Sequence, residues 1–227
     1  MMKRQIAFLL LVCATMTVYA QDFNPNTKWP YIYENFTDGT IYFEGNKKTE
    51  SQLNIHLWGN KLHYLNADQK IFESSDKGII RVEIGADAYI YSNHQLVKLL
   101  AVVENNVLVQ LTKADWDALF TGTGAYGASL NSSSSRDLSS LELAGLGKPE
   151  LGLLLQERHD GREISLKTQY LFIIDGRQIE ANKGDVEDVL NDEGKKVWKS
   201  FLKQNKIKWK NVESLQKVLS YINQYHR

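Results

Sequence analysis

Alternation of hydrophobic and polar positions dominates residues 29–112 and predicts a series of short β-strands. Two clear alternating sets are Ile80, Val82, Ile84 and Val107, Val109, Leu111. Turn-forming residues such as Gly45-Asn46 and Gly85-Ala86-Asp87 recur roughly every eight to twelve positions, as in antiparallel β proteins. This rhythm predicts an antiparallel meander or sandwich-like β region.

One predicted hairpin surrounds Gly59-Asn60. If these two residues form the turn, Trp58 lies opposite Lys61 and His56 lies opposite His63. The hydrophobic face of this hairpin carries Leu53, Ile55, Leu57, Leu62 and Tyr64. The more polar face carries His56, Trp58 and His63, which we interpret as a candidate contact patch. Two imidazoles alone do not supply the three or four ligands that zinc sites use, so no metal site is predicted.

Composition changes after the predicted strands. Residues 113–120 suggest a short helix, because Trp116 and Phe120 lie four positions apart. Residues 122–147 are rich in Gly and Ser, which predicts a mobile loop that carries Tyr126 as a further contact residue. Gly122 to Gly127 matches G-x-G-x-x-G, but a nucleotide site needs a strand before it and a helix after it. No cofactor is therefore expected.

The pattern changes from strands to helices near residue 180. Asp160-Gly161 and Asp175-Gly176 are strong hairpin signals. Asn182 and Asn211 are expected N-caps, and Val197 with Phe201 marks another helix, after Gly194. The predicted fold class is therefore α+β, with an antiparallel β-rich domain over residues 21–182. Residues 183–227 form about three C-terminal helices packed on the same domain.

The first 20 residues have the features of a secretory signal peptide. Lys3 and Arg4 precede a short hydrophobic run, and Val18-Tyr19-Ala20 suits a cleavage site. Cleavage would remove Cys13 and the methionines Met1, Met2 and Met16, which are all the sulfur atoms of the chain. We expect a periplasmic or extracellular protein that lacks disulfides and does not span the membrane after cleavage. It would carry two fewer basic than acidic residues, which gives no reason to expect nucleic-acid binding.

A lysine-rich stretch stands out near the C-terminus. It contains Lys195, Lys196, Lys199, Lys203, Lys206, Lys208 and Lys210, without an intervening acid. Packing explains it if Val197, Phe201, Ile207 and Trp209 face the core while the lysines face water, and this interpretation is favoured. Alternatively, Lys196, Lys199, Lys203, Lys206 and Lys208 contact an anionic membrane surface.

Catalytic chemistry has weaker support. Asp115 and Asp117 flank Trp116, and two carboxylates can hydrolyse glycosides. Nothing in the sequence places a sugar-binding cleft around them, so no catalytic residue is assigned. A hydrolase acting on envelope or dietary polysaccharide remains an alternative hypothesis.

Several segments together resemble a family of uncharacterised exported proteins from Bacteroidota. They are Trp29-Pro30-Tyr31, Tyr33, Phe36 and Gly39-Thr40-Ile41-Tyr42 near the start, residues 80–85 and 124–127, and residues 201–210, 213–215 and Tyr221 near the end. The resemblance implies a single exported domain with an internal loop in a Gram-negative envelope, and it implies no activity. We therefore expect a non-catalytic binding or structural module, whose partner is another envelope protein or a glycan.

Overall fold

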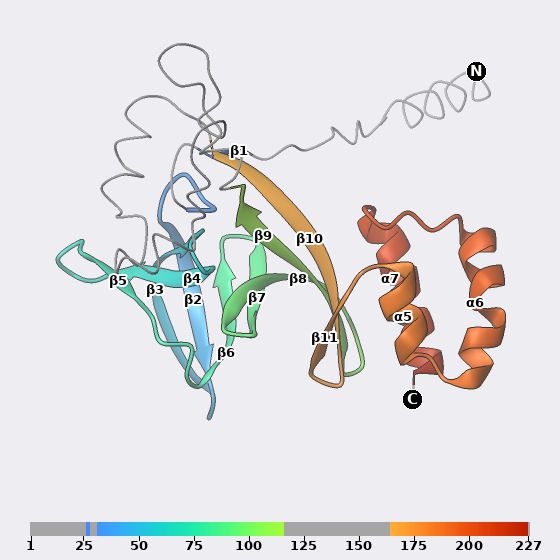
Figure 1. The fold of residues 1–227 in the computed structure, drawn as a ribbon. Coiled ribbons are helices and arrows are strands. Elements are labelled where there is room, and N and C mark those ends of the chain that lie inside the picture. Colours follow the sequence, from blue (N-terminus) through green and yellow to red (C-terminus); the bar gives the residue numbers. More distant parts are fainter. Residues whose placement is uncertain (1–25, 28–30, 116–163, 227) are drawn as a thin grey trace, which may run out of the picture.

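A long antiparallel sheet followed by three helices forms the described part of the chain (Figure 1). The computed structural model describes residues 26–27, 31–115 and 164–226. The strands are β1 (Asn26–Thr27), β2 (Thr37–Phe43), β3 (Lys47–His56), β4 (Lys61–Leu65), β5 (Ile71–Glu73), β6 (Ile79–Ile84), β7 (Asp87–Ser92), β8 (Gln95–Val103), β9 (Asn106–Ala114), β10 (Ile164–Ile174) and β11 (Arg177–Glu180). The helices are α5 (Lys183–Val189), α6 (Asp192–Asn205) and α7 (Val212–Tyr225), numbered as in Figure 1. This arrangement confirms the predicted α+β fold class.

The 11-stranded sheet has the order β1-β10-β9-β8-β7-β6-β2-β3-β4-β5, with β11 added beside β10. Hairpins connect neighbours along much of this path. At Asp175-Gly176 the predicted two-residue turn is confirmed, because Ile174 pairs with Arg177 and both turn residues have positive φ. The turns after β7 and β8 lie at Asn93-His94 and Glu104-Asn105. The sequence pattern predicts them at Ser92-Asn93 and Asn105-Asn106, so the first prediction is one position too early and the second is one position too late.

The displaced turn before β9 has a physical reason in Asn106, which is only 2% exposed. Its side-chain nitrogen donates to Asn223 Oδ1 at 3.1 Å, and its Oδ1 accepts from the backbone nitrogen of Asp175 at 3.3 Å. These contacts join β9 to α7 and to the β10–β11 turn. Asn106 therefore belongs to the strand, although its residue type is typical of turns.

The predicted register of the β3–β4 hairpin is wrong by two residues. His56, not Trp58, pairs with Lys61, and Asn54 pairs with His63. The turn therefore spans Leu57 to Asn60. Its tip packs inward, because the Asn60 carbonyl accepts from the backbone nitrogen of Leu96 at 2.9 Å. A shift of two keeps every side chain on its predicted face.

The sheet is curled and carries hydrophobic clusters on both faces. Leu96 and Val97 are consecutive in β8, so they point to opposite faces, yet they are 2% and 1% exposed. Leu96 belongs to a cluster centred on β2–β7, and Val97 to a cluster of β8–β10. The β7–β8 turn reaches β11, since Ser92 Oγ donates to Gln178 Oε1 at 2.8 Å. This contact crosses three intervening strands, which requires strong curling.

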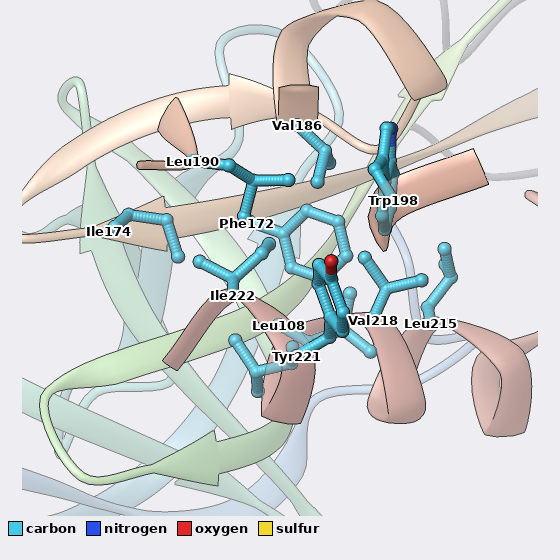
Figure 2. Close-up of a cluster of buried hydrophobic side chains, with 11 residues drawn as sticks. Leu108, Phe172, Ile174, Val186, Leu190, Trp198, Leu215, Val218, Tyr221 and Ile222 are labelled. Atoms are coloured by element: carbon cyan, nitrogen blue, oxygen red, sulfur yellow. The ribbon is translucent and has the colours of Figure 1, made fainter. Parts of the chain in front are cut away.

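The three helices lie together at one end of the molecule, beside β10 and β11 (Figure 1). They share one core with the sheet, in which Phe172 of β10 and Leu108 of β9 contact helical side chains (Figure 2). Asn182 and Asn211 cap α5 and α7 through hydrogen bonds to the backbone nitrogens of Asp185 and Ser214, as predicted.

Helix α6 differs from its prediction at its start and in its buried face. It begins at Asp192, because Asn191 accepts from the Gly194 backbone nitrogen and caps it. Trp198 is fully buried, whereas Val197 is 44% exposed. The earlier start does not alter which side chains share a face, so the error lies in choosing Val197 over Trp198 for the core.

The predicted helix over residues 113–120 is wrong at its first positions. Lys113 and Ala114 form the end of β9, paired with Lys167 and Leu166 of β10. The rest of that segment lies outside the described residues. The signal peptide, the 122–147 loop with Tyr126, Asp117 and the Asp160-Gly161 turn also lie outside them.

Candidate functional site

The predicted contact patch on β3–β4 is a packed aromatic cluster. The rings of His56 and His63 stack with centroids 4.9 Å apart. Tyr31 contacts both imidazoles edge-on, and its hydroxyl is 3.0 Å from His63 Nδ1. Phe36 adds an edge-on contact to Tyr31 at 5.2 Å between centroids. The predicted pairing of His56 with His63 is therefore diagonal across the two strands.

This cluster fastens residues 31–36 to the hairpin. Tyr31 is only 1% exposed and forms a β-bridge with His56. On the opposite side of His63, Nε2 lies 3.6 Å from Glu73 Oε2 of β5. Trp58 is half-buried, and its backbone nitrogen donates to His56 Nδ1 at 3.3 Å. Internal packing buries most of the ring surface of this cluster. The patch therefore exposes less area to a partner than the sequence suggests.

Neither a metal site nor the hydrolase site has a complete set of side chains among the described residues. Among the residues that the structure describes, no three His, Cys, Asp or Glu side chains are grouped so that they could hold a metal ion. Asp115, the first carboxylate of the hydrolase hypothesis, forms an ion pair with Lys167 at 2.8 Å. Its proposed partner, Asp117, lies outside the described ranges.

A second polar network surrounds Tyr33. Its hydroxyl donates to Asp87 Oδ2 at 2.9 Å and lies 2.6 Å from the hydroxyl of Tyr89. Lys98 forms an ion pair with the other oxygen of Asp87 at 2.6 Å. Burial raises the pKa of Tyr33 and Tyr89, and the neighbouring hydroxyl and carboxylate raise the pKa of Tyr33 further. This network holds residues 31–36 against β7 and β8.

Stability is expected to fall at alkaline pH because several tyrosines keep their protons in the folded state. Burial raises the pKa of both Tyr31 and Tyr91 to about 12. An unfolded tyrosine ionises near pH 10, so between about pH 10 and 12 the folded chain binds more protons than the unfolded chain. Unfolding free energy should therefore decrease as pH rises through this window, by up to about 1.4 kcal/mol per pH unit for each such tyrosine.

Urea unfolding between pH 8 and 12, with phenolate absorbance followed in parallel, measures this effect. Tyr31→Phe removes one late-ionising hydroxyl and should make the decline shallower. A decline with the same slope in the wild type and in Tyr31→Phe would contradict this assignment.

The lysine-rich stretch presents an exposed basic face. Lys196, Lys199, Lys203, Lys206 and Lys208 are all exposed. None of these five forms an ion pair or a side-chain hydrogen bond with another residue in the described part of the chain. The buried side of the same segment consists of aromatic rings, since Trp198 contacts Phe201, Trp209 and Tyr221. The prediction that the lysines face water is therefore confirmed, as is core packing by Phe201, Ile207 and Trp209.

A groove runs between α6 and α7, beside the lysines. Its volume is about 510 Å³, and its lining includes Val197, Phe201, Lys217, Tyr221 and Tyr225. Sequence reasoning missed this groove because it assigned Val197 to the core. The available signal was a repeated spacing of four, Val197 with Phe201 on α6 and Tyr221 with Tyr225 on α7, which places each pair on one helix face.

A second concave region lies between the β10–β11 hairpin, α5 and the C-terminal end of α7. It has a volume of about 440 Å³, and charged groups including Arg177, Asp188 and Glu180 line it. His226 Nε2 pairs with Asp175 Oδ2 at 3.2 Å at its edge. Two of the lining acids already stabilise the fold: Asp185 accepts from the Glu180 backbone nitrogen, and Glu180 accepts from Gln169.

The described helices are all too short or too polar to cross a membrane. Among the described residues, we take the exposed lysines of α6 and the adjoining groove as the candidate site. Compared with protein-family models, curated proteins and solved structures, the chain matches none of them.

Proposed function

We propose that this protein is an exported, non-catalytic binding module of the cell envelope, which holds an anionic partner through the lysine face of α6. The observation that carries the proposal is the row Lys196, Lys199 and Lys203, exposed and without ion pairs to any described residue. The predicted signal peptide and the resemblance to exported proteins motivate the envelope setting.

The lysine row has a defined geometry. Lys196, Lys199 and Lys203 are three and four positions apart, so they follow one side of the helix. Trp198 projects to the opposite side, where it is fully buried. The buried ring therefore fixes which side of α6 faces outward, and the cationic groups are presented together.

Packing explains why these lysines face water, but it does not require charges of the same sign along the row. Within the row, Lys199 and Lys203 are four residues apart, and like charges at that spacing destabilise a helix by a few tenths of a kcal/mol. An outward face with both basic and acidic residues would allow the same packing with less electrostatic repulsion within the helix. An anionic partner would neutralise this repulsion, which makes binding more favourable than it would be at an ordinary helix surface.

Replacing Lys196, Lys199 and Lys203 together with Gln is expected to weaken binding to dextran sulfate about a hundredfold at low salt. Each lysine near an anionic surface contributes about 1 kcal/mol, so three contribute about 3 kcal/mol. Fluorescence anisotropy with labelled dextran sulfate, measured over a salt series, gives the affinities. Binding by the wild type should also weaken as added salt screens the charges.

The matched control replaces Lys47, Lys70 and Lys77 with Gln. These residues are also exposed, lie on the hairpins around β2–β6, and change the net charge by the same amount. Control affinity should remain within about twofold of the wild type, because these lysines lie far from α6. Equal weakening in both triple variants, or no measurable binding by the wild type, would refute the proposed function.

A further inference from the structure

We infer that the anionic partner is an acidic amphipathic helix of another protein, and that its hydrophobic side occupies the groove between α6 and α7. This inference rests on the proposed function and specifies the partner for the same surface. The groove, its floor and the charges near it each restrict what can bind there.

The groove offers hydrophobic contact along both helices. Val197 and Phe201 line it from α6, and Tyr221 and Tyr225 line it from α7. Val197 is 44% exposed, although the next residue, Trp198, is completely buried. An exposed aliphatic side chain inside a concave surface gains most when a partner covers it.

The floor of the groove is fixed before any partner binds. Phe201 and Tyr221 stack with ring centroids 4.2 Å apart, and the Tyr221 hydroxyl donates to the Gly194 carbonyl at 2.7 Å. Gly194 permits this close approach of the helices, because a Cβ atom there would lie 2.6 Å from Tyr225 Cβ. A rigid floor lowers the entropic cost of binding.

One basic residue lines the groove, and the lysine row lies on the neighbouring side of α6. Lys217 lines it from α7, and Lys196 begins the lysine row on the outer side of α6. The acids of α6 and α7 are Asp192, Glu193 and Glu213, and all of them lie in the first turns of these helices. Positive charge therefore lies in the groove at Lys217 and beside it along the lysine row, which complements a partner with hydrophobic residues on one side and acids on its edges.

The shape favours a helix over a membrane or a sugar. Membrane binding needs hydrophobic side chains that project from the surface into the lipid, whereas here they line a concavity. Sugar rings stack on open aromatic faces, but Phe201 and Tyr221 already stack on each other. A convex ridge of hydrophobic residues at helical spacing is the complementary shape, as in other helix-in-groove complexes.

Synthetic acidic amphipathic helices provide the test. A set of peptides of about five helical turns carries Leu at i, i+3, i+4 and i+7 with Glu elsewhere, in each of several registers. Shuffled peptides have the same composition but no hydrophobic side. Fluorescence anisotropy should show at least one patterned peptide binding at least tenfold more tightly than its shuffled partner.

Two substitutions separate the groove from general charge effects. Val197→Glu places a carboxylate in the groove at an exposed position and should weaken binding of the patterned peptide at least tenfold. Ile80→Glu makes the same change at a residue of β6 that is 55% exposed, and it should leave peptide affinity unchanged. Both variants should keep the wild-type circular dichroism spectrum.

The outcomes distinguish this inference from the proposed function. Equal binding of patterned and shuffled peptides, or no peptide binding while dextran sulfate still binds, would overturn the helix and leave the anionic surface intact. Loss of dextran sulfate binding as well would overturn both. If Val197→Glu instead reduced binding to phosphatidylglycerol vesicles while leaving peptide binding unchanged, the groove would be a lipid site and the inference would be wrong.

Discussion

Replacing Trp198 with alanine should lower the free energy of unfolding by about 3–5 kcal/mol, the range for removing a large buried aromatic side chain. Trp198 is completely buried in the core that joins α6 and α7 to β9 and β10 (Figure 2). Its indole contacts Phe201, Trp209 and Tyr221. Alanine would leave a cavity where these rings meet. It would also remove the buried side chain that fixes which side of α6 carries the lysine row outward.

Trp198→Phe should be much less harmful, by at least about 2 kcal/mol relative to alanine. The indole Nε1 is buried and has no hydrogen-bond partner among the described residues. Phenylalanine removes this unsatisfied donor while it retains most of the hydrophobic contact, so part of the lost packing is offset. Comparing the two variants therefore separates the contribution of the aromatic ring to stability from that of the buried N–H group.

Urea unfolding followed by far-UV circular dichroism measures both variants. Val197→Ala is the matched control, because Val197 is the adjacent residue but points into the open groove. It should cost less than about 1 kcal/mol. If Val197→Ala and Trp198→Ala destabilise the protein equally, the orientation assigned to α6 is incorrect.

Local signals explain why much of the helical layer could be predicted. Asn182 and Asn211 accept from backbone nitrogens three residues ahead, an interaction that is complete within one turn. Asp175-Gly176 likewise determines its own hairpin, since both residues tolerate positive φ. Neither feature requires contact with distant parts of the chain.

Long-range contacts explain the errors. Trp198 and Val197 are both hydrophobic, but Trp198 is the one that packs against Trp209 and Tyr221, which lie further along the chain. The β3–β4 register depends on Asn60 meeting Leu96 of β8, a contact that the sequence of the hairpin does not encode. For the candidate site, the exposure of the lysines followed from their own pattern, whereas the groove required knowledge of how two helices meet.

Asn54 is the clearest case of a polar residue whose role only the folded structure reveals. The alternating pattern places it on the polar side of β3, yet it is fully buried. Its Oδ1 accepts from the backbone nitrogens of Tyr33 and Ile55 at 3.1 and 2.8 Å. Its Nδ2 donates to the carbonyls of Tyr33 and Asn35 at 2.9 and 3.2 Å. Asn54 thus supplies the hydrogen bonds that an irregular segment beside β3 cannot obtain from a regular ladder.

Asn54→Leu is therefore expected to lower the free energy of unfolding by about 3–5 kcal/mol, although leucine is nearly the same size. Each buried backbone group left without a partner costs about 1–3 kcal/mol, and water can reach part of the set at Asn35. Urea unfolding measures the loss. Asn66→Ala is the control: Asn66 accepts from the backbone nitrogens of Asp68 and Lys70 in an exposed turn, so its removal should cost only about 1 kcal/mol.

Asn54→Asp tests the same network through pH. The carboxylate keeps the acceptor but faces the carbonyl oxygens of Tyr33 and Asn35 without a proton to donate, so the folded state should raise the pKa of the new acid. Above that pKa the folded variant carries a buried charge, which lowers its free energy of unfolding relative to the wild type. As pH falls through it, the folded chain binds a proton that the unfolded chain does not bind until about pH 4, and the deficit relative to the wild type should shrink. A deficit that stays constant between pH 7 and 4.5 would show that the two donated hydrogen bonds do not hold residues 31–36 in place.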